Sequence, residues 1–351
     1  MFISKLKIHN FRNIKFKEFE FSQQINIFHG NNGVGKTSIL EAIHFLSSGK
    51  SFRKGNFKTL INFNSDNLTV YLECLLSANP SSISVNKSNN GKWKGKINNT
   101  YLNKQFEITN ILPVVSIDPE VYRLVDFGPL YRRNFLDWLV FHVKHDYLLL
   151  WKKVYKCIKQ LNLLYKSKAH VDQIELWEST FVDLSIKLNN VRENVFLEIL
   201  PNIYKLSSFM QEEINNLCVE FKKGWSKDIS LKEQMTMDRK KNLLYGQLQH
   251  GPHKMDIKIN TGTQQASQTL SRGQKKLLSI TFYMAYIQYL NLNDVNPILC
   301  LDDFDAEIDK DKLFKSADFF KKTTSQIFIT SVQKNKIYRA FPKAELFHVK
   351  H

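Results

Sequence analysis

The sequence lacks the features that mark membrane and secreted proteins. It contains no run of about 18 apolar residues, so no membrane-spanning helix is expected. Its first residues alternate like a strand and carry neither the apolar core nor the cleavage site of a signal peptide, which predicts a cytoplasmic protein. Internal repeats and low-complexity tracts are missing as well. The length of 351 residues and the 43% hydrophobic content suit one large globular domain or two ordinary ones.

Cysteine is scarce and forms no recognisable motif. The four cysteines are far apart in the chain and include no C-x-x-C pair: Cys74, Cys157, Cys218 and Cys300. Three histidines in the middle of the chain, His142, His145 and His170, lack metal-ligand partners at helical spacing. The sequence therefore predicts no zinc site, and we expect the cysteines to be reduced and mostly buried.

Acidic residues are in short supply. The chain has 33 Asp and Glu against 50 Lys and Arg, a formal charge of +17 and a pI near 9.5. This excess indicates a polyanionic partner, most simply nucleic acid. The alternative is a basic surface without a partner, because the chain is also rich in Lys, Asn, Ile and Phe and this bias can reflect genome composition.

The most informative stretch is 30–37, which reads GNNGVGKT and fits the P-loop pattern G-x-x-x-x-G-K-[ST]. Its glycines let backbone N–H groups point at phosphate oxygens, Lys36 would reach the β- and γ-phosphates, and the Thr37 hydroxyl would hold Mg²⁺. A predicted strand at 25–28 leads into the loop and a predicted helix at 37–46 leaves it. The predicted ATP-binding residues are Gly30, Asn31, Asn32, Gly33, Val34, Gly35, Lys36 and Thr37.

A second motif is the apolar run 298–301, which is followed by Asp302 and Asp303. Continuous apolar runs are typical of buried parallel strands, and a further one is expected at 326–330. Asp302 would orient the water shell of the Mg²⁺ ion, and Asp303 would position or deprotonate the attacking water. The predicted catalytic residues are Asp303 and Lys36, and the predicted Mg²⁺ ligands are Thr37 and Asp302.

The third motif, Leu-Ser-Arg-Gly-Gln at 270–274, stands before a long predicted helix. It is similar to the L-S-x-G-[QE] signature of ABC-type ATPases, and the start of a helix can bind anions. The alternative is an ordinary helix start that Ser271 caps. A P-loop kinase or GTPase would leave this stretch without a role.

The middle of the chain, from 119 to about 246, is predicted to be mainly helical. Apolar residues recur at heptad spacing from 174 to 195, after a capping box of Asp172 and Glu175, and Pro201 is expected to end this helix. With the preceding helix it would form a short antiparallel coiled coil or part of an ordinary bundle. The predicted division is an N-terminal head part at 1–118, a helical arm at 119–244 and a C-terminal head part at 245–351.

The N-terminal part is predicted to be rich in strands, at 2–28, 68–76, 82–87 and 92–102, with Asn98-Asn99 at a turn. Its basic stretch 49–55 could contact phosphates. Arg12 could touch nucleotide or DNA, or be an exposed turn arginine.

Several stretches together resemble a known family. They are Phe11-Arg12-Asn13, the segment 128–138, Gly251-Pro252-His253-Lys254, the segment 269–274, and Asp302-Asp303-Phe304 with Glu307-Ile308-Asp309. In this order they resemble the SMC-like branch of the ABC ATPases, and within it the RecF family of recombination mediators. The resemblance implies an α/β fold, in which an ABC-type P-loop ATPase head of mixed β-sheets and flanking helices carries an inserted, mainly α-helical arm lobe.

The resemblance also implies a function. It implies an ATP-dependent homodimer that binds double-stranded DNA and single/double-strand junctions, hydrolyses ATP slowly with DNA stimulation, and acts in repair, replication and SOS induction. RecR and RecO would be partners, with RecA loaded at single-strand gaps. In trans, the signature residues Ser271, Arg272, Gly273 and Gln274 would close on the P-loop of the second copy. The alternative function is an ABC-type subunit that energises a protein partner without touching DNA.

Two departures from the family pattern concern turnover. Ala306 stands where the family often has a serine, and no histidine follows the strand 326–330. Thr330, Ser331 or Gln333 could sense the γ-phosphate instead. Both departures are compatible with slow hydrolysis.

Overall fold

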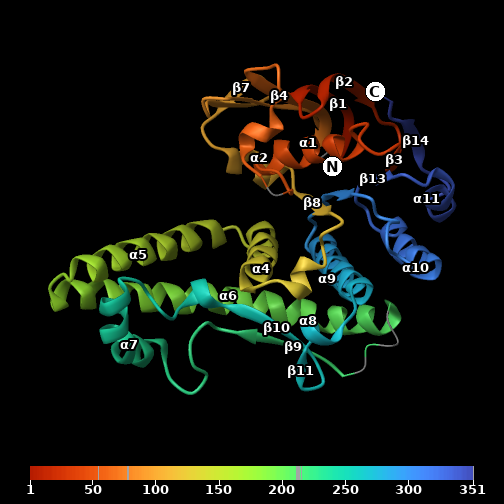
Figure 1. The fold of residues 1–351 in the computed structure, drawn as a ribbon. Helices are drawn as coiled ribbons and strands as arrows, with labels where there is room; N and C mark the ends of the chain where they lie inside the picture. Colours follow the sequence, from red (N-terminus) through yellow and green to blue (C-terminus); the bar gives the residue numbers. More distant parts are fainter. Residues whose placement is uncertain (54, 77–78, 211–213, 215, 351) are drawn as a thin grey trace. The chain divides into compact units, whose positions relative to one another are not determined.

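The computed structural model describes residues 1–53, 55–76, 79–210, 214 and 216–350, which fall into two compact units (Figure 1). Unit 1 comprises Met1–Val121 and Leu290–His351, and unit 2 comprises Tyr122–Tyr289. The two ends of the chain thus build one unit around an inserted one. The sequence predicts 245–289 as part of the head, whereas these residues pack with unit 2, because the strand at 256–261 pairs with one at 217–222.

Unit 1 contains a parallel sheet of the order β14-β3-β13-β12-β8. Its strands are β3 (Ile25–His29), β8 (Val114–Ile117), β12 (Ile298–Leu301), β13 (Ile327–Ser331) and β14 (Glu345–His348). All residues of β12 and β13 are buried, as their unbroken apolar sequences require when both faces of the sheet are covered. The strands predicted at 25–28, 298–301 and 326–330 are therefore confirmed.

A second, antiparallel sheet of unit 1 has the order β2-β1-β4-β5-β6-β7. Its strands are β1 (Phe2–Phe11), β2 (Ile14–Glu20), β4 (Asn67–Leu76), β5 (Asn79–Ser88), β6 (Trp93–Ile97) and β7 (Thr100–Leu102). Asn98 and Asn99 have φ values of 46° and 67° and form the predicted turn, which divides the predicted strand 92–102 in two. Helix α1 (Lys36–Ser48) joins one hydrophobic core with residues of both sheets.

The remaining elements of unit 1 are short. They are η1 (Phe57–Leu60), α2 (Gln105–Ile111), α10 (Lys310–Lys321) and α11 (Lys334–Ala340). Three of the four cysteines are buried, and Cys218 of unit 2 is partly exposed. No helix in the described ranges is long and apolar enough to cross a membrane.

Unit 2 is built on α5 (Tyr147–Ser167) and α6 (Val171–Met210), which pack side by side and are joined by a three-residue link at 168–170 (Figure 1). The predicted helical hairpin is thus present. Its other elements are α3 (Arg123–Asp126), α4 (Pro129–Val143), β9 (Leu217–Lys222), α7 (Leu231–Tyr245), η2 (Pro252–Lys254), β10 (Asp256–Thr261), β11 (Gln264–Gln265), α8 (Ala266–Thr269) and α9 (Arg272–Leu292). The last of these continues into unit 1.

Two predictions about α6 were wrong. Pro201 does not end the helix, which continues to Met210 because Ile203 and Met210 bury their side chains on the same face as the residues before the proline. Asp172 does not form a capping box, because the helix begins at Val171 and Glu175 instead pairs with Arg239 at 2.6 Å. The region predicted to be mainly helical also contains the strand β9, which pairs with β10.

Candidate nucleotide-binding site

The loop 30–35 connects β3 to α1 at the edge where the parallel strands end. Gly30 and Gly35 have φ values of 151° and 100°, which disfavour any other residue. A Cβ atom at Gly30 would lie 2.5 Å from the Val349 carbonyl oxygen, and one at Gly35 would lie 3.1 Å from the Asn13 side chain. Gly30 and Gly35 are therefore needed for both conformation and space, whereas Gly33, with a φ of 84°, is needed for conformation alone.

Lys36 folds back over this loop. Its side chain is almost completely buried, and Nζ donates hydrogen bonds to the carbonyl oxygens of Gly30 at 3.0 Å and Asn31 at 2.9 Å. An ammonium group that is held by two neutral carbonyls can exchange them for charged phosphate oxygens, which are stronger acceptors. The predicted phosphate-binding lysine is thus positioned inside its loop.

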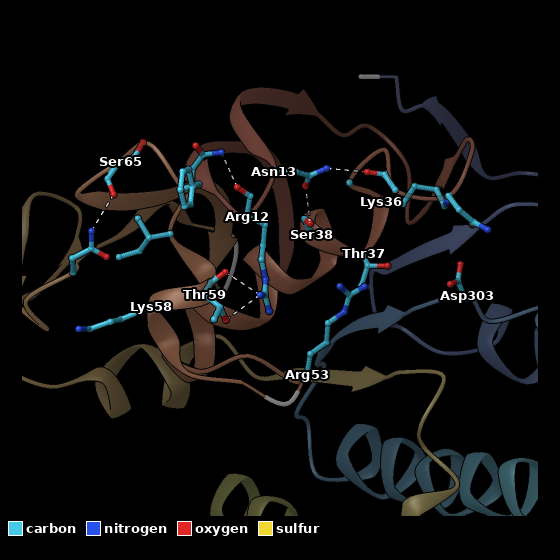
Figure 2. A pocket seen from close by; sticks show the side chains of 17 residues that line it. Arg12, Asn13, Lys36, Thr37, Ser38, Arg53, Lys58, Thr59, Ser65 and Asp303 are labelled. Carbon is cyan, nitrogen blue, oxygen red and sulfur yellow. Dashed lines mark hydrogen bonds between the residues drawn. The ribbon is translucent and has the colours of Figure 1, made fainter.

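The turn between β1 and β2 braces the loop. The Asn13 amide donates to the Gly33 carbonyl oxygen at 3.0 Å, and its own oxygen accepts the Ser38 hydroxyl at 3.1 Å (Figure 2). Asn13 therefore links the β1–β2 turn to both the P-loop and α1. These contacts give a physical reason why Asn13, in the stretch Phe11-Arg12-Asn13, accompanies the P-loop.

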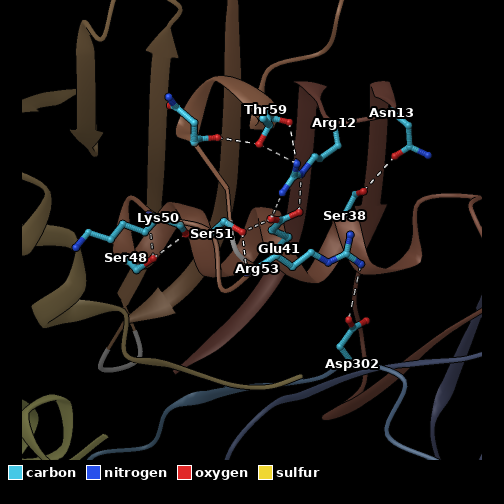
Figure 3. Close-up of polar contacts among 11 residues, drawn as sticks. Arg12, Asn13, Ser38, Glu41, Ser48, Lys50, Ser51, Arg53, Thr59 and Asp302 are labelled. Carbon is cyan, nitrogen blue, oxygen red and sulfur yellow. Dashed lines mark hydrogen bonds and ion pairs between the residues drawn. The ribbon is translucent and has the colours of Figure 1, made fainter. Parts of the chain in front are cut away.

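Asp302 lies at the end of β12, beside β13, and only 3% of it is exposed. Its carboxylate accepts a hydrogen bond from the Thr330 hydroxyl at 2.7 Å, and Arg53 Nη2 lies 4.0 Å away (Figure 3). Burial raises the pKa of the Asp302 carboxyl, and hydrogen bonds from Thr330 and Thr37 oppose this rise. The two residues predicted to hold Mg²⁺, Thr37 and Asp302, are thus brought together from the two ends of the chain.

These two side chains fit a magnesium ion by their chemistry. Mg²⁺ prefers oxygen ligands and usually takes only one or two from the protein, with the others coming from substrate phosphates and water. A hydroxyl and a carboxylate that already share a hydrogen bond can both turn their oxygens toward such an ion.

Asp303 differs from Asp302 in its surroundings. Its backbone has a φ of 41°, and its N–H donates to the Thr330 hydroxyl oxygen at 2.8 Å. Its Oδ1 atom is buried and has no hydrogen-bond partner within the described residues. The side chain lines the same cavity as Lys36 and Thr37 (Figure 2). Buried polar atoms are rarely left unpaired, which marks the Asp303 carboxylate as a functional candidate and not a purely structural group.

Arg12 lines the cavity, as a nucleotide-contacting residue would, and its guanidinium also has a structural role. Its guanidinium forms two hydrogen bonds to the Glu41 carboxylate, at 2.9 and 2.7 Å, and two more to Thr59 (Figure 3). Glu41 is fully buried in α1 and also accepts the Ser51 hydroxyl. Arg12 therefore neutralises a buried carboxylate behind the P-loop and connects Thr59 to α1, while Ser51 is bound to the same carboxylate.

The cavity has a volume of about 790 Å³. Its end away from Lys36 is formed by residues that the motifs did not indicate: Lys58, Asn62, Phe63, Ser65 and Asn89. Phe63 is 99% exposed, and its neighbour Asn62 donates to the Arg12 carbonyl oxygen at 2.7 Å. The only signal in the sequence is one phenylalanine in an otherwise polar loop.

The signature stretch lies in unit 2, at the start of α9. The Gln274 N–H donates to Ser271 Oγ at 3.3 Å, and the Ser271 N–H donates to Gln274 Oε1 at 2.9 Å, which makes a capping box. The reading of Ser271 as a helix cap is therefore confirmed. Ser271, Arg272 and Gly273 are exposed, and the position of a Cβ at Gly273 is in open space.

The three residues considered as γ-phosphate sensors are Thr330, Ser331 and Gln333, and all three already take part in other hydrogen bonds. Thr330 bridges Asp302 and the Asp303 backbone. The Ser331 hydroxyl accepts the Gln333 N–H at 3.0 Å. Ala306 lies in the turn that follows the acid pair, and its N–H donates to the Asp303 carbonyl oxygen at 3.0 Å.

A parallel sheet with a P-loop after β3, paired carboxylates after β12 (separated from β3 by β13), an antiparallel second sheet and a helical insertion with a capped signature stretch define an ABC-type P-loop ATPase head. The model of the RecF/RecN/SMC N-terminal domain family matches residues 2–351. The chain therefore belongs to the SMC-like ABC ATPases and, as its curated relatives show, to the RecF family within them.

Two of these relatives are proteins named DNA replication and repair protein RecF. The protein from Coxiella burnetii (strain RSA 493 / Nine Mile phase I) is 33% identical over 100% of this chain and 98% of its own length. The protein from Pseudoalteromonas translucida (strain TAC 125) is 32% identical, with the same coverage.

Solved structures agree with this assignment. The recombination mediator protein RecF bound to ATP, described as part of the RecFOR pathway, matches with a TM-score of 0.85 and 25% identity over 95% of this chain and 92% of that one. An SMC head bound to the C-terminal winged-helix domain of ScpA matches with a TM-score of 0.59 and 16% identity, over 96% of this chain and 91% of that one, and shows the shared fold alone.

Proposed function

We propose that the chain binds ATP with Mg²⁺ at 30–37 and hydrolyses it slowly to ADP and phosphate as a DNA-dependent switch. The observation that carries this proposal is one cavity lined by Lys36, Thr37 and Asp303. An ATP-bound RecF structure with nearly the same fold supports the nucleotide.

Each residue of the cavity has a defined part in this proposal. The loop N–H groups and Lys36 bind the phosphates. Thr37 and Asp302 would hold Mg²⁺, which when bound would supply positive charge to the phosphate groups. Asp303 accepts a hydrogen bond from the attacking water and takes its proton as the bond from the water oxygen to the γ-phosphorus forms. The bond from the γ-phosphorus to the bridging oxygen breaks, and ADP leaves with that oxygen. The Thr330 hydroxyl holds the Asp302 carboxylate and the Asp303 backbone in position through its two hydrogen bonds.

The far end of the cavity suits the base. Phosphates at Lys36 direct the rest of the nucleotide along the cavity toward the β1–β2 turn and the loop 61–65, which is hydrogen-bonded to that turn. There the exposed Phe63 ring offers a face for stacking, and the amides of Asn62 and Asn89 can pair with ring nitrogens. A volume of about 790 Å³ is within the usual range of ligand pockets.

The switch needs a second copy. Ser271 to Gln274 of one chain would close on the P-loop of the other, since the exposed start of α9 presents a hydroxyl and N–H groups that suit phosphate. The closed homodimer would bind double-stranded DNA and single/double-strand junctions through its basic residues, consistent with the charge of +17. The names of its relatives support a role in DNA replication and repair and in the RecFOR pathway. We further propose a cytoplasmic location, RecR and RecO as partners, and RecA loading at gaps and SOS induction as consequences.

The test compares ATP hydrolysis with and without duplex DNA over a series of salt concentrations. Binding through phosphates weakens steeply with salt, so stimulation should disappear as salt rises. The basal rate of a Lys36→Ala variant is the control. Equal rates with and without DNA at low salt would favour the alternative, an ATPase subunit that energises a protein partner without DNA contact.

A further inference from the structure

A groove of about 620 Å³ lies in unit 1 beside α10 and α11. Helix α10 contributes Lys310 and Phe314, and the remaining lining residues belong to α11 and the residue before it: Gln333, Lys334, Asn335, Lys336 and Arg339. All charged residues that line the groove are cationic, so it has a positive potential.

The groove is a consequence of how the two helices pack. Helix α10 buries Leu313 and Phe320 in the core, and α11 buries Ile337, whereas Phe314 remains only half-buried at the groove. Lys334 and Arg339 are exposed and form no ion pair with a carboxylate anywhere in the described part of the chain. By contrast, Lys321 at the other end of α10 pairs with Asp318 at 2.6 Å.

Lys336 connects the groove to the acid pair. Its Nζ donates to the carbonyl oxygens of Asp305 at 2.9 Å and Ile308 at 3.1 Å, in the turn that follows Asp303. A ligand in the groove thus lies one side chain away from the backbone that positions Asp303.

We propose that this groove docks an acidic segment of a partner protein. Carboxylates of the segment pair with Lys334 and Arg339, and an apolar side chain between them covers Phe314. The charge of +17 makes a second copy of this chain a poor source of such a segment. Duplex DNA fits less well, because its phosphate backbone has no apolar side chain for Phe314 and its contacts are mainly polar.

The test starts with a phage-displayed library of short random peptides, selected on the full-length protein without nucleotide. We expect enrichment of peptides that combine Asp or Glu with an aromatic or aliphatic residue. A fluorescein-labelled copy of a selected peptide should bind the Lys334→Glu/Arg339→Glu variant at least about tenfold more weakly than the wild type. The matched control, Lys321→Glu/Lys322→Glu, has the same change in charge outside the groove and should bind like the wild type.

A third variant, Phe314→Ser, changes no charge and should also weaken the peptide, which separates docking from general attraction between opposite charges. Circular dichroism checks that each variant is folded. The proposal fails if no acidic peptides are enriched, or if they bind the groove and control variants equally. It also fails if the groove variant alone loses affinity for a labelled DNA duplex while no peptide is selected, since the groove would then be a nucleic-acid surface. Because no nucleotide is present, these results do not depend on the proposed ATPase activity.

Discussion

Thr330 donates its hydroxyl proton to the Asp302 carboxylate across 2.7 Å, from the neighbouring parallel strand. This hydrogen bond opposes the rise in the pKa of Asp302 that burial causes. It thereby favours the ionised form that a magnesium ligand must have. The strand pairing of β12 with β13 is therefore part of the chemistry of the site.

Replacement of Thr330 by valine should weaken the binding of Mg²⁺ with ATP. The loss of a hydrogen bond to a charged group costs about 1.5–3 kcal/mol, or roughly one to two powers of ten in affinity. Without this hydrogen bond, the pKa of the Asp302 carboxyl should be higher than in the wild type. Binding should therefore partly recover as pH rises, because a higher pH restores the ionised carboxylate. Magnesium titrations of ATP binding at several pH values measure both effects. Thr330→Ser is the control, and an unchanged magnesium dependence in Thr330→Val would contradict the assignment.

The variant Asp303→Asn should keep ATP binding but lose hydrolysis by about 10²–10⁴-fold, because an amide cannot take the proton of the water. The ATP-bound homodimer should then accumulate, as seen by analytical ultracentrifugation. Lys36→Ala should instead lose ATP binding and stay monomeric. An Asp303→Asn protein that remains monomeric with ATP would refute the proposed dimer switch.

Removal of Arg12 should destabilise the fold before it affects the nucleotide. Arg12→Met leaves the fully buried Glu41 without its partner, at a cost of about 3–5 kcal/mol. A second change, Glu41→Gln, should restore much of this loss. Denaturant unfolding measures the free energy, and ATP affinity of the double variant serves as the control. A stable Arg12→Met protein that cannot bind ATP would show that Arg12 is a nucleotide contact instead.

Phe63→Ala should reduce ATP affinity by about three- to tenfold, since stacking of this kind is worth around 1 kcal/mol. Phe63→Trp should retain it. Inorganic triphosphate, which has no base, should bind wild type and Phe63→Ala equally in a calorimetric titration. If triphosphate loses as much affinity as ATP, the base does not reach Phe63.

Stability should fall on acidification because of His44, which is half-buried in α1 and hydrogen-bonded to Ser116 Oγ at 2.8 Å. Removal of its ring from water lowers its pKa to about 4, from the ordinary histidine value of 6.5. Between these values the unfolded chain binds a proton that the folded chain does not, so stability decreases as pH falls through this window, by about 3 kcal/mol in total. His44→Gln should reduce the slope of unfolding free energy against pH. The exposed His170→Gln should have no such effect, and equal slopes in the two variants would exclude His44 as the cause.

The parts of the site that follow from local sequence could be predicted. The P-loop needs its glycines for backbone conformation, and β12 and β13 are recognisable because strands buried on both faces are apolar throughout. Because the carboxyl ends of parallel strands lie at the same edge of a sheet, the residues that follow β12 and β13 could be placed near the P-loop. The Ser271 cap is also local, since it depends on residues three apart.

What could not be predicted depends on partners that are distant in the sequence. Arg12 pairs with Glu41 only because the β1–β2 turn lies over α1, and Thr330 reaches Asp302 only through strand pairing. Pro201 lies inside α6 because packing of the surrounding face outweighs the lost hydrogen bond. Phe63 had no periodicity to mark it, because its position is determined by a loop and not by a helix or strand.

The position of β3 in its sheet has a consequence for synthesis of the protein. This strand carries the P-loop near the start of the chain, yet its two neighbours are β13 and β14, and Val349 donates its N–H to the His29 carbonyl oxygen. The ribosome therefore releases the P-loop long before the strands that flank it. A nascent chain holds an unfinished candidate nucleotide site until β13 and β14 have been translated, and chains that are cut short before β13 would not compete for the proposed nucleotide.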